Sequence, residues 1–131
     1  MALNYYAKEL KENAQLLASK GKGILAVDES TKTVGKRLAG IGVENSEENR
    51  KAYRGMLFTT KDLGKYISGA ILFEETLFQN HPDGEPMVKK LNDLGIIPGI
   101  KVDKGLNPLP GGKDVETFCS GLDGLVERAA K

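Results

Sequence analysis

The chain has 131 residues, with 19 lysines and arginines against 18 aspartates and glutamates, so its formal net charge is +1. Hydrophobic residues make up 40% of it and charged residues 28%, which is typical of a soluble globular protein and excludes a collagen-like, disulfide-stapled or disordered chain. A net charge near zero argues against nucleic acid or a membrane surface as the main partner. Length and composition alone predict one small domain.

Residues 1–13 mix lysine and glutamate and contain neither a secretory signal nor a transit peptide. No stretch approaches the roughly 20 apolar residues of a membrane span. Cys119 is the only cysteine, so an internal disulfide is impossible and a reducing compartment is expected. These features predict a cytoplasmic protein, or a plastid protein if a transit peptide is missing from this sequence.

Apolar spacing divides the chain into alternating helices and strands. A helical face (Tyr6, Leu10, Ala14, Leu17) comes first, and Gly21 ends that helix. Three continuous apolar runs, 24–27, 67–73 and 96–102, then predict buried strands, with Gly69 allowing close packing in the second.

Helices are predicted between these strands. Ser30 or Thr31 can cap a helix over 32–38, and a capping-box pattern starts another at Asn45 or Ser46. Pro86 suits the first position of a third helix, residues 107–112 read as a loop, and helical spacing returns at Leu122, Leu125, Val126 and Ala129. This order indicates βαβ units and an α/β fold with a parallel sheet.

Each predicted strand ends in charged residues, at the position where parallel α/β folds gather their chemistry. The three ends carry Asp28-Glu29-Ser30, Glu74-Glu75-Thr76 and Lys101-Val102-Asp103. Lys101 lies between Ile100 and Val102, so its ammonium must find a carboxylate or an anionic ligand. An ion pair with Asp28 and a place in a functional site are both open at this point. Glu74 and Glu75 point to opposite sides, so at most one of them enters a given site.

Hydroxyls and arginines follow the first strand. Ser30 and Thr33 lie at a predicted helix N-terminus, which can hold a phosphate, although an N-cap role alone explains Ser30 as well. Arg37 follows one turn later. For Arg50 the sequence by itself favours a solvated helix face. No glycine-rich nucleotide loop and no metal-ligand spacing is present in the sequence.

Several blocks of the sequence resemble the class I fructose-bisphosphate aldolase family. They are GKGILAVDEST at 21–31, Glu44-Asn45 with Glu48-Asn49-Arg50 at 44–50, ILFEETL at 71–77, PGIKVDKG at 98–105 and GLDGL at 121–125. The blocks occur in the family's order and spacing from about Tyr6 to Lys131. The segment ILFEET is similar to the corresponding sequence in the plant and algal branch of the family.

The resemblance implies that residues 1–131 are the N-terminal part of a single TIM (β/α)8 barrel domain, with three parallel strands and flanking helices, left incomplete. It also implies metal-free cleavage of fructose 1,6-bisphosphate to dihydroxyacetone phosphate and glyceraldehyde 3-phosphate, through a Schiff base on a lysine and without a cofactor. The implied partners are a sugar bisphosphate substrate and, for intact members, the other subunits of a homotetramer.

By position, Asp28 matches the family's active-site aspartate, and Lys101 matches a lysine that contacts substrate. Ser30 and Thr33 match hydroxyls near the substrate phosphate. Arg37 and Arg50 match substrate-binding arginines. Two phosphates on one sugar require several cations and helix-start donors, which agrees with this set.

The family's Schiff-base lysine, its glutamate proton acceptor and its second phosphate loop have no counterpart in the chain. We therefore expect the 131 residues alone to lack lyase activity. The alternative is a truncated, non-catalytic paralogue that binds a phosphorylated ligand or a protein partner.

Overall fold

The computed structural model describes residues 5–124. Its main sheet contains β1 (Gly23–Val27), β2 (Ile67–Leu72) and β3 (Ile97–Ile100) in the order β1-β2-β3, and both pairings are parallel. The register places Val27 beside Leu72 and Leu72 beside Ile100, so the three strands end at one level. The parallel sheet predicted from the apolar runs is confirmed.

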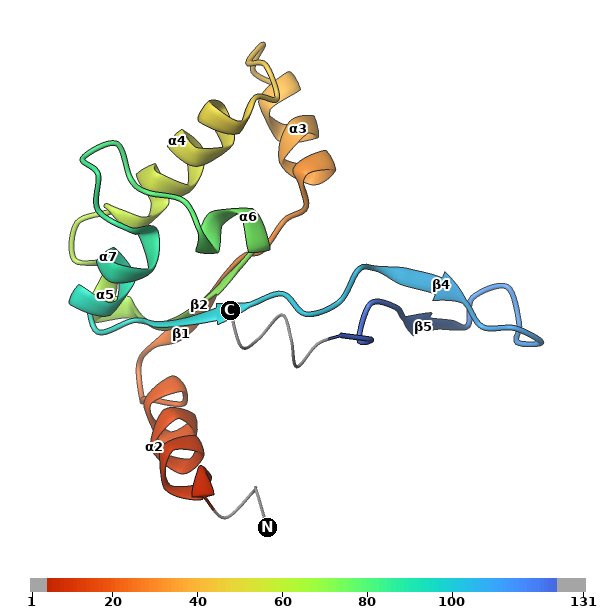
Figure 1. The fold of residues 1–131 in the computed structure, drawn as a ribbon, viewed down its shortest axis with the longest axis horizontal. Coiled ribbons are helices and arrows are strands. Elements are labelled where there is room, and N and C mark those ends of the chain that lie inside the picture. The colour runs from red at the N-terminus through yellow and green to blue at the C-terminus, as the bar shows by residue number, and fades with distance from the viewer. Residues whose placement is uncertain (1–4, 125–131) are drawn as a thin grey trace.

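Helices fill both crossovers and gather above the sheet in Figure 1. The first crossover contains α3 (Thr31–Ala39), α4 (Glu47–Phe58) and α5 (Leu63–Tyr66), and the second contains α6 (Glu74–Leu77) and α7 (Met87–Asp93). The one-turn helices α5 and α6 were not predicted, because four residues are too few to show a period of 3.6. α2 (Ala7–Leu17) precedes β1 and extends away from the other helices.

The core lies between β2 and the helices α4 and α7. Leu72, Met87 and Leu91 are fully buried there, and Phe58 is 1% exposed. Burial of each such side chain contributes about 1.5–3 kcal/mol. This packing fixes the positions of α4 and α7 relative to the sheet.

β1 is less buried than its continuous apolar run predicts. Only Val27 is buried, and Ile24 is 53% exposed. The reason is its position: β1 is an edge strand of the described sheet, and little packs against its first half. β3 is shorter than predicted, since it ends at Ile100, although the Lys101 N–H still donates to the Leu72 carbonyl at 2.8 Å.

α2 contacts the start of β2 through Leu17. The Ser68 hydroxyl donates to the Leu17 carbonyl at 2.7 Å. A Cβ at Gly69 would lie 2.4 Å from Leu17 Cδ2, so the close packing predicted for this glycine is confirmed. Most of the apolar face of α2 is open, with Tyr6 and Leu10 each more than half exposed.

Serines cap the two longer crossover helices. The Ser30 hydroxyl accepts a hydrogen bond from the Thr33 N–H, which confirms it as the α3 N-cap. Ser46, not Asn45, caps α4, because its hydroxyl accepts from the Asn49 N–H at 3.2 Å. Asn45 instead donates from its side chain to the Thr31 carbonyl.

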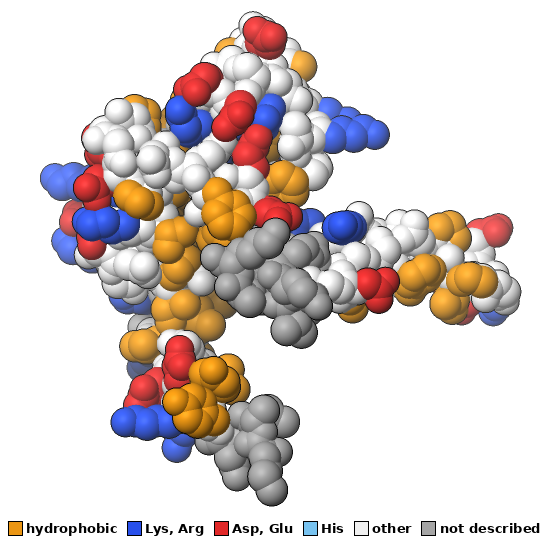
Figure 2. All heavy atoms as spheres, in the orientation of Figure 1, with side chains coloured by type: hydrophobic (Ala, Val, Ile, Leu, Met, Phe, Trp, Pro, Cys, Tyr) orange, Lys and Arg blue, Asp and Glu red, His pale blue; other side chains and the backbone are white. Residues whose placement is uncertain are grey.

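An antiparallel hairpin of β4 (Leu106–Pro108) and β5 (Thr117–Cys119) projects from the sheet (Figure 1). The loop predicted over 107–112 is therefore wrong at its first two residues. Figure 2 shows hydrophobic side chains gathered on this hairpin and on α2, where Leu106 is 66% and Tyr6 55% exposed. The helical pattern at the C-terminus falls mainly on 125–131, outside the described residues.

Between residues 5 and 124, none of the helices combines the length and the apolar character needed to span a bilayer.

Candidate functional site

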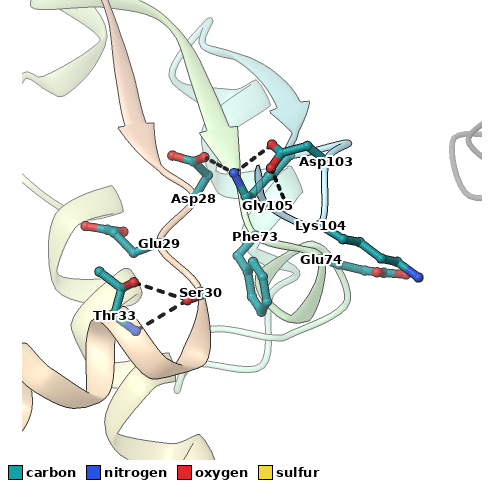
Figure 3. A pocket seen from close by; sticks show the side chains of 10 residues that line it. Asp28, Glu29, Ser30, Thr33, Phe73, Glu74, Asp103, Lys104 and Gly105 are labelled. Carbon is teal, nitrogen blue, oxygen red and sulfur yellow. Dashed lines mark hydrogen bonds and ion pairs between the residues drawn. The ribbon is translucent and has the colours of Figure 1, made fainter. Parts of the chain in front are cut away.

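A cleft of about 560 Å³ opens where the three strands end (Figure 3). The strand ends supply Asp28, Phe73 and Lys101, which follow the paired residues Val27, Leu72 and Ile100. The complete lining is Asp28, Glu29, Ser30, Thr33, Phe73, Glu74, Lys101, Asp103, Lys104 and Gly105. The sheet register therefore brings together polar residues that are far apart in sequence.

Lys101 is shared between two carboxylates. Its Nζ lies 2.7 Å from Asp103 Oδ2 and 3.5 Å from Asp28 Oδ2, and about a quarter of each of the three side chains is exposed. The hydrogen bond to Asp103 raises the pKa of Lys101, and the same contact lowers the pKa of Asp103. Lys101 is thus a stable cation at neutral pH. The ion pair with Asp28 left open by the sequence is present, but Asp103 is the closer partner.

Hydroxyls form the opposite side of the cleft. Ser30 Oγ lies 3.1 Å from Thr33 Oγ1 and accepts from the Thr33 N–H at 3.4 Å. Both residues stand at the N-terminus of α3, whose free N–H groups favour an anion. Ser30 therefore both caps α3 and lines the cleft.

Glu29 lines the cleft, but its carboxylate is held by residues of α3 and α4. It accepts a short hydrogen bond from Arg37 and a longer one, at 3.4 Å, from the Tyr53 hydroxyl. Arg54 Nη2 lies 3.2 Å from the carboxylate and donates to the Glu29 carbonyl at 2.9 Å. Burial lowers the pKa of Arg54, and the charge of Glu29 opposes that effect.

Arg50 forms a second arginine–glutamate pair away from the cleft. Its Nε donates to Glu75 at 2.9 Å, its Nη2 donates to the same carboxylate, and Nη1 donates to the Asn45 side chain. The hydrogen bond from Arg50 lowers the pKa of Glu75. With 12% of its side chain exposed, Arg50 is not on a solvated helix face as its sequence alone suggested.

Four of the six predicted site residues meet in the cleft: Asp28, Ser30, Thr33 and Lys101. Arg37 and Arg50 do not line it. Arg37 contacts it through Glu29, and Arg50 is bound to Glu75. Of the two adjacent glutamates, Glu74 lines the cleft and Glu75 does not, so at most one enters it, as predicted. The reason differs, because both lie in α6 and not on a strand, and successive helix residues are turned by about 100°.

Sequence reasoning missed Tyr53 and Arg54 as supports of the site. A tyrosine on a helix suits an apolar face, and an arginine on a helix is ordinarily solvated. The signal available was their spacing, because positions 50, 53 and 54 share one helical face.

The family model described as Fructose-bisphosphate aldolase class-I matches residues 9–131. The chain belongs to this class I aldolase family. It is 60% identical over 125 residues to the chloroplastic fructose-bisphosphate aldolase of Spinacia oleracea, which covers 95% of the chain and 32% of that relative. It is 64% identical over 125 residues to fructose-bisphosphate aldolase 1 of Toxoplasma gondii, covering 95% of the chain and 34% of the relative.

A solved structure of the aldolase from Plasmodium falciparum, in complex with TRAP and a small-molecule inhibitor, matches the fold with a TM-score of 0.88 at 60% identity. The match covers 93% of this chain and 35% of that one. The chain thus spans about a third of the length of the aldolases it matches. Its three parallel strands and helices are part of the TIM-barrel aldolase fold, and residues 5–124 do not close a barrel.

Proposed function

We propose that the cleft is one wall of a Schiff-base aldolase site that cleaves fructose 1,6-bisphosphate. The observation that carries the proposal is the Asp28–Lys101–Asp103 group at the ends of the strands, which faces the Ser30 and Thr33 hydroxyls across one cleft. Family membership supports the same reaction.

Lys101 acts as a fixed cation in this proposal and not as the nucleophile. A lysine that forms a Schiff base must be neutral when it attacks, so its pKa has to be lowered. The two carboxylates beside Lys101 have the opposite effect on its pKa. Its ammonium suits an anionic or strongly polar group of the substrate.

Asp28 is proposed to orient and polarise the reacting hydroxyl. In aldol cleavage the C3–C4 bond breaks, the C4 hydroxyl passes its proton to a general base, and C4 becomes the aldehyde carbon. The C3–C4 bonding electrons form the C2=C3 bond of an enamine, while the electrons of the C2=N bond move to the nitrogen of the iminium that the nucleophilic lysine has formed. We assign that lysine to no residue of this chain.

Ser30 and Thr33 are proposed to bind one phosphate at the α3 N-terminus, with Arg37 adding charge from one turn further along. Arg50 is proposed as a substrate-binding residue only after its guanidinium leaves Glu75, because its donors are now directed to Glu75 and Asn45.

A chimera tests this proposal. The chain replaces the matched third of the Spinacia oleracea aldolase, and cleavage of fructose 1,6-bisphosphate is measured. We expect an active chimera, and an inactive 131-residue chain when it is assayed alone. Borohydride trapping with dihydroxyacetone phosphate should label a lysine in the Spinacia part, and an adduct on any lysine of this chain would refute the assignment.

Variants of the chimera locate the site. Lys101→Met and Asp28→Asn should each lower kcat/KM by at least about 100-fold, in the range of lost transition-state electrostatics. Lys22→Met is the matched control, since its Nζ is bound to the Gly64 carbonyl at the other end of β1. Equal activity in all three variants would contradict the proposal.

A phosphate-binding module without catalysis is the second candidate, because the hydroxyl side of the cleft is formed within this chain. Sequencing the coding frame beyond Lys131 separates the two. A stop codon directly after Lys131 favours the module, and continuation into further strands favours the enzyme.

We further propose that the intact protein is a homotetramer in the cytoplasm, or in the plastid if a transit peptide precedes this sequence. Names of relatives such as the Spinacia oleracea protein support the plastid alternative. Light scattering of the intact protein and imaging of a tagged copy are the tests.

A further inference from the structure

A buried arginine outside the cleft, Arg54, holds the turn at residues 28–30. This turn carries Asp28 and Ser30, two of the residues that line the cleft. Arg54 lies in the middle of α4 and is 2% exposed. Its Nη2 donates to the Glu29 carbonyl at 2.9 Å and lies 3.2 Å from the Glu29 carboxylate. One nitrogen therefore contacts both the backbone and the side chain of a single residue.

Glu29 stands between the two functional parts of that turn. Asp28 precedes it and reaches Lys101, and Ser30 follows it and caps α3. Figure 3 shows the Glu29 carboxylate lying apart from the Asp28 carboxylate. Fixing the Glu29 carbonyl sets where the chain leaves β1, and so sets the directions of both neighbours.

Arg54 depends on Glu29 in return. Within residues 5–124, its Nε and Nη1 form no hydrogen bond. The ring of Tyr53 lies 5.2 Å from its guanidinium carbon. A buried charge that keeps so few partners is costly unless its single ion pair is maintained. The cost favours the arrangement in which Glu29 stays against α4.

We propose that Arg54 is a positioning residue for the aldolase site, acting through Glu29 on Asp28 and Ser30. The proposal rests on the proposed function for its kinetic part and on the geometry alone for its structural part. It also assigns Glu29 a supporting role, in place of an acid or base role that its location in the cleft would otherwise suggest.

Hydrogen exchange on the 131-residue chain tests the structural part of the proposal and does not require an active enzyme. Arg54→Met keeps the length of the side chain and removes its charge and donors. We expect faster exchange confined to 28–34, where the Thr33 and Val34 N–H groups are bound to Ser30. Arg54→Lys should show a smaller change. Lys51→Met is the matched control, because its partner Glu48 lies on the same helix.

The kinetic part uses the chimera. Arg54→Met should lower kcat/KM at least tenfold, and Arg54→Lys should recover part of that loss. Glu29→Gln should lower kcat/KM less than Arg54→Met does. When Glu29→Gln is added to Arg54→Met, kcat/KM should not fall further, since both changes remove the same contact. Lys51→Met should leave kcat and KM within twofold of the parent.

The outcomes separate the two proposals. An inactive parent chimera contradicts the proposed function, and the exchange data then decide the role of Arg54. Exchange that rises uniformly shows that Arg54 only stabilises the fold, and exchange that does not change shows that Arg54 does not hold the turn. Either result overturns the inference. Additive losses for Glu29→Gln and Arg54→Met overturn it as well, because Glu29 would then act on substrate directly. If Arg54→Met does not fold, Arg54→Lys and Glu29→Gln give the same decisions.

Discussion

The ammonium of Lys101 lies 2.7 Å from the carboxylate of Asp103, two residues further along the chain. Asp103 also accepts the Gly105 N–H at 2.9 Å, so its carboxylate is held by the backbone as well. Lys101 is thus positioned by its own loop before any ligand arrives. The contact determines how strongly the lysine keeps its proton.

Replacing Asp103 with asparagine should lower the pKa of Lys101, because the hydrogen bond from this carboxylate is the main cause of its raised value. Asp28 remains as the weaker partner, so part of the effect should persist. The titration is measured from the Lys101 Cε chemical shift. Asp114→Asn, in the hairpin loop, is the control and should leave the curve in place. An unchanged curve in Asp103→Asn would show that the contact is absent in solution.

The free energy of unfolding should be constant from pH 7 to about pH 5 and should fall below that. The pKa values of Glu75 and Asp103 are lowered in the folded chain, whereas unfolded carboxyls titrate near about 4. Their contribution is therefore present above the unfolded pKa and lost as the pH falls through the folded one. Urea unfolding at several pH values measures this. Glu75→Gln should flatten the acid limb, and the exposed Glu9→Gln should not.

Gly69→Ala should destabilise the chain by about 1 kcal/mol, since overpacking forces neighbours to shift. The new Cβ would lie 2.4 Å from Leu17 Cδ2. Gly99→Ala on β3 is the control, because its Cβ would meet nothing closer than the Ala70 carbonyl at 3.6 Å. The comparison is made by urea unfolding. Adding Leu17→Ala to Gly69→Ala should relieve the clash, and an additive loss would indicate another cause.

Ser46→Ala should cost about 1 kcal/mol, the usual value for a lost N-cap. The Asn49 N–H would lose its acceptor at the start of α4. Thermal unfolding followed by circular dichroism measures the change. Ser19→Ala removes an exposed hydroxyl bonded to the Leu16 carbonyl and should have almost no effect. Equal losses in the two variants would mean that Ser46 does not act as a cap.

The sequence was sufficient to predict the parallel sheet and the side of it that carries the polar residues. Both follow from local patterns: continuous apolar runs, and charges directly after them. The meeting of Asp28 and Lys101 follows as well, because parallel strands of one sheet end together.

Tertiary contacts explain what could not be predicted. The partner of Arg54 lies 25 residues away, and whether α4 turns that arginine inward depends on how Phe58 and Met87 pack. The hairpin strands have only three residues each, with Pro108 in one of them, so no alternation is visible. The predicted burial of β1 was wrong because an apolar run does not show how many neighbouring strands and helices will pack against it.

The common level at which Val27, Leu72 and Ile100 end has a consequence for how the cleft can change. The residues that line it directly follow the hydrogen-bonded strands of the sheet, so the positions of these residues are fixed by the register of strand pairing. Inserting one residue within β3 would turn Lys101 to the opposite face of the sheet. The same insertion at the tip of the β4–β5 hairpin would leave it in place. Tolerance to length changes in this chain should therefore alternate sharply between neighbouring segments.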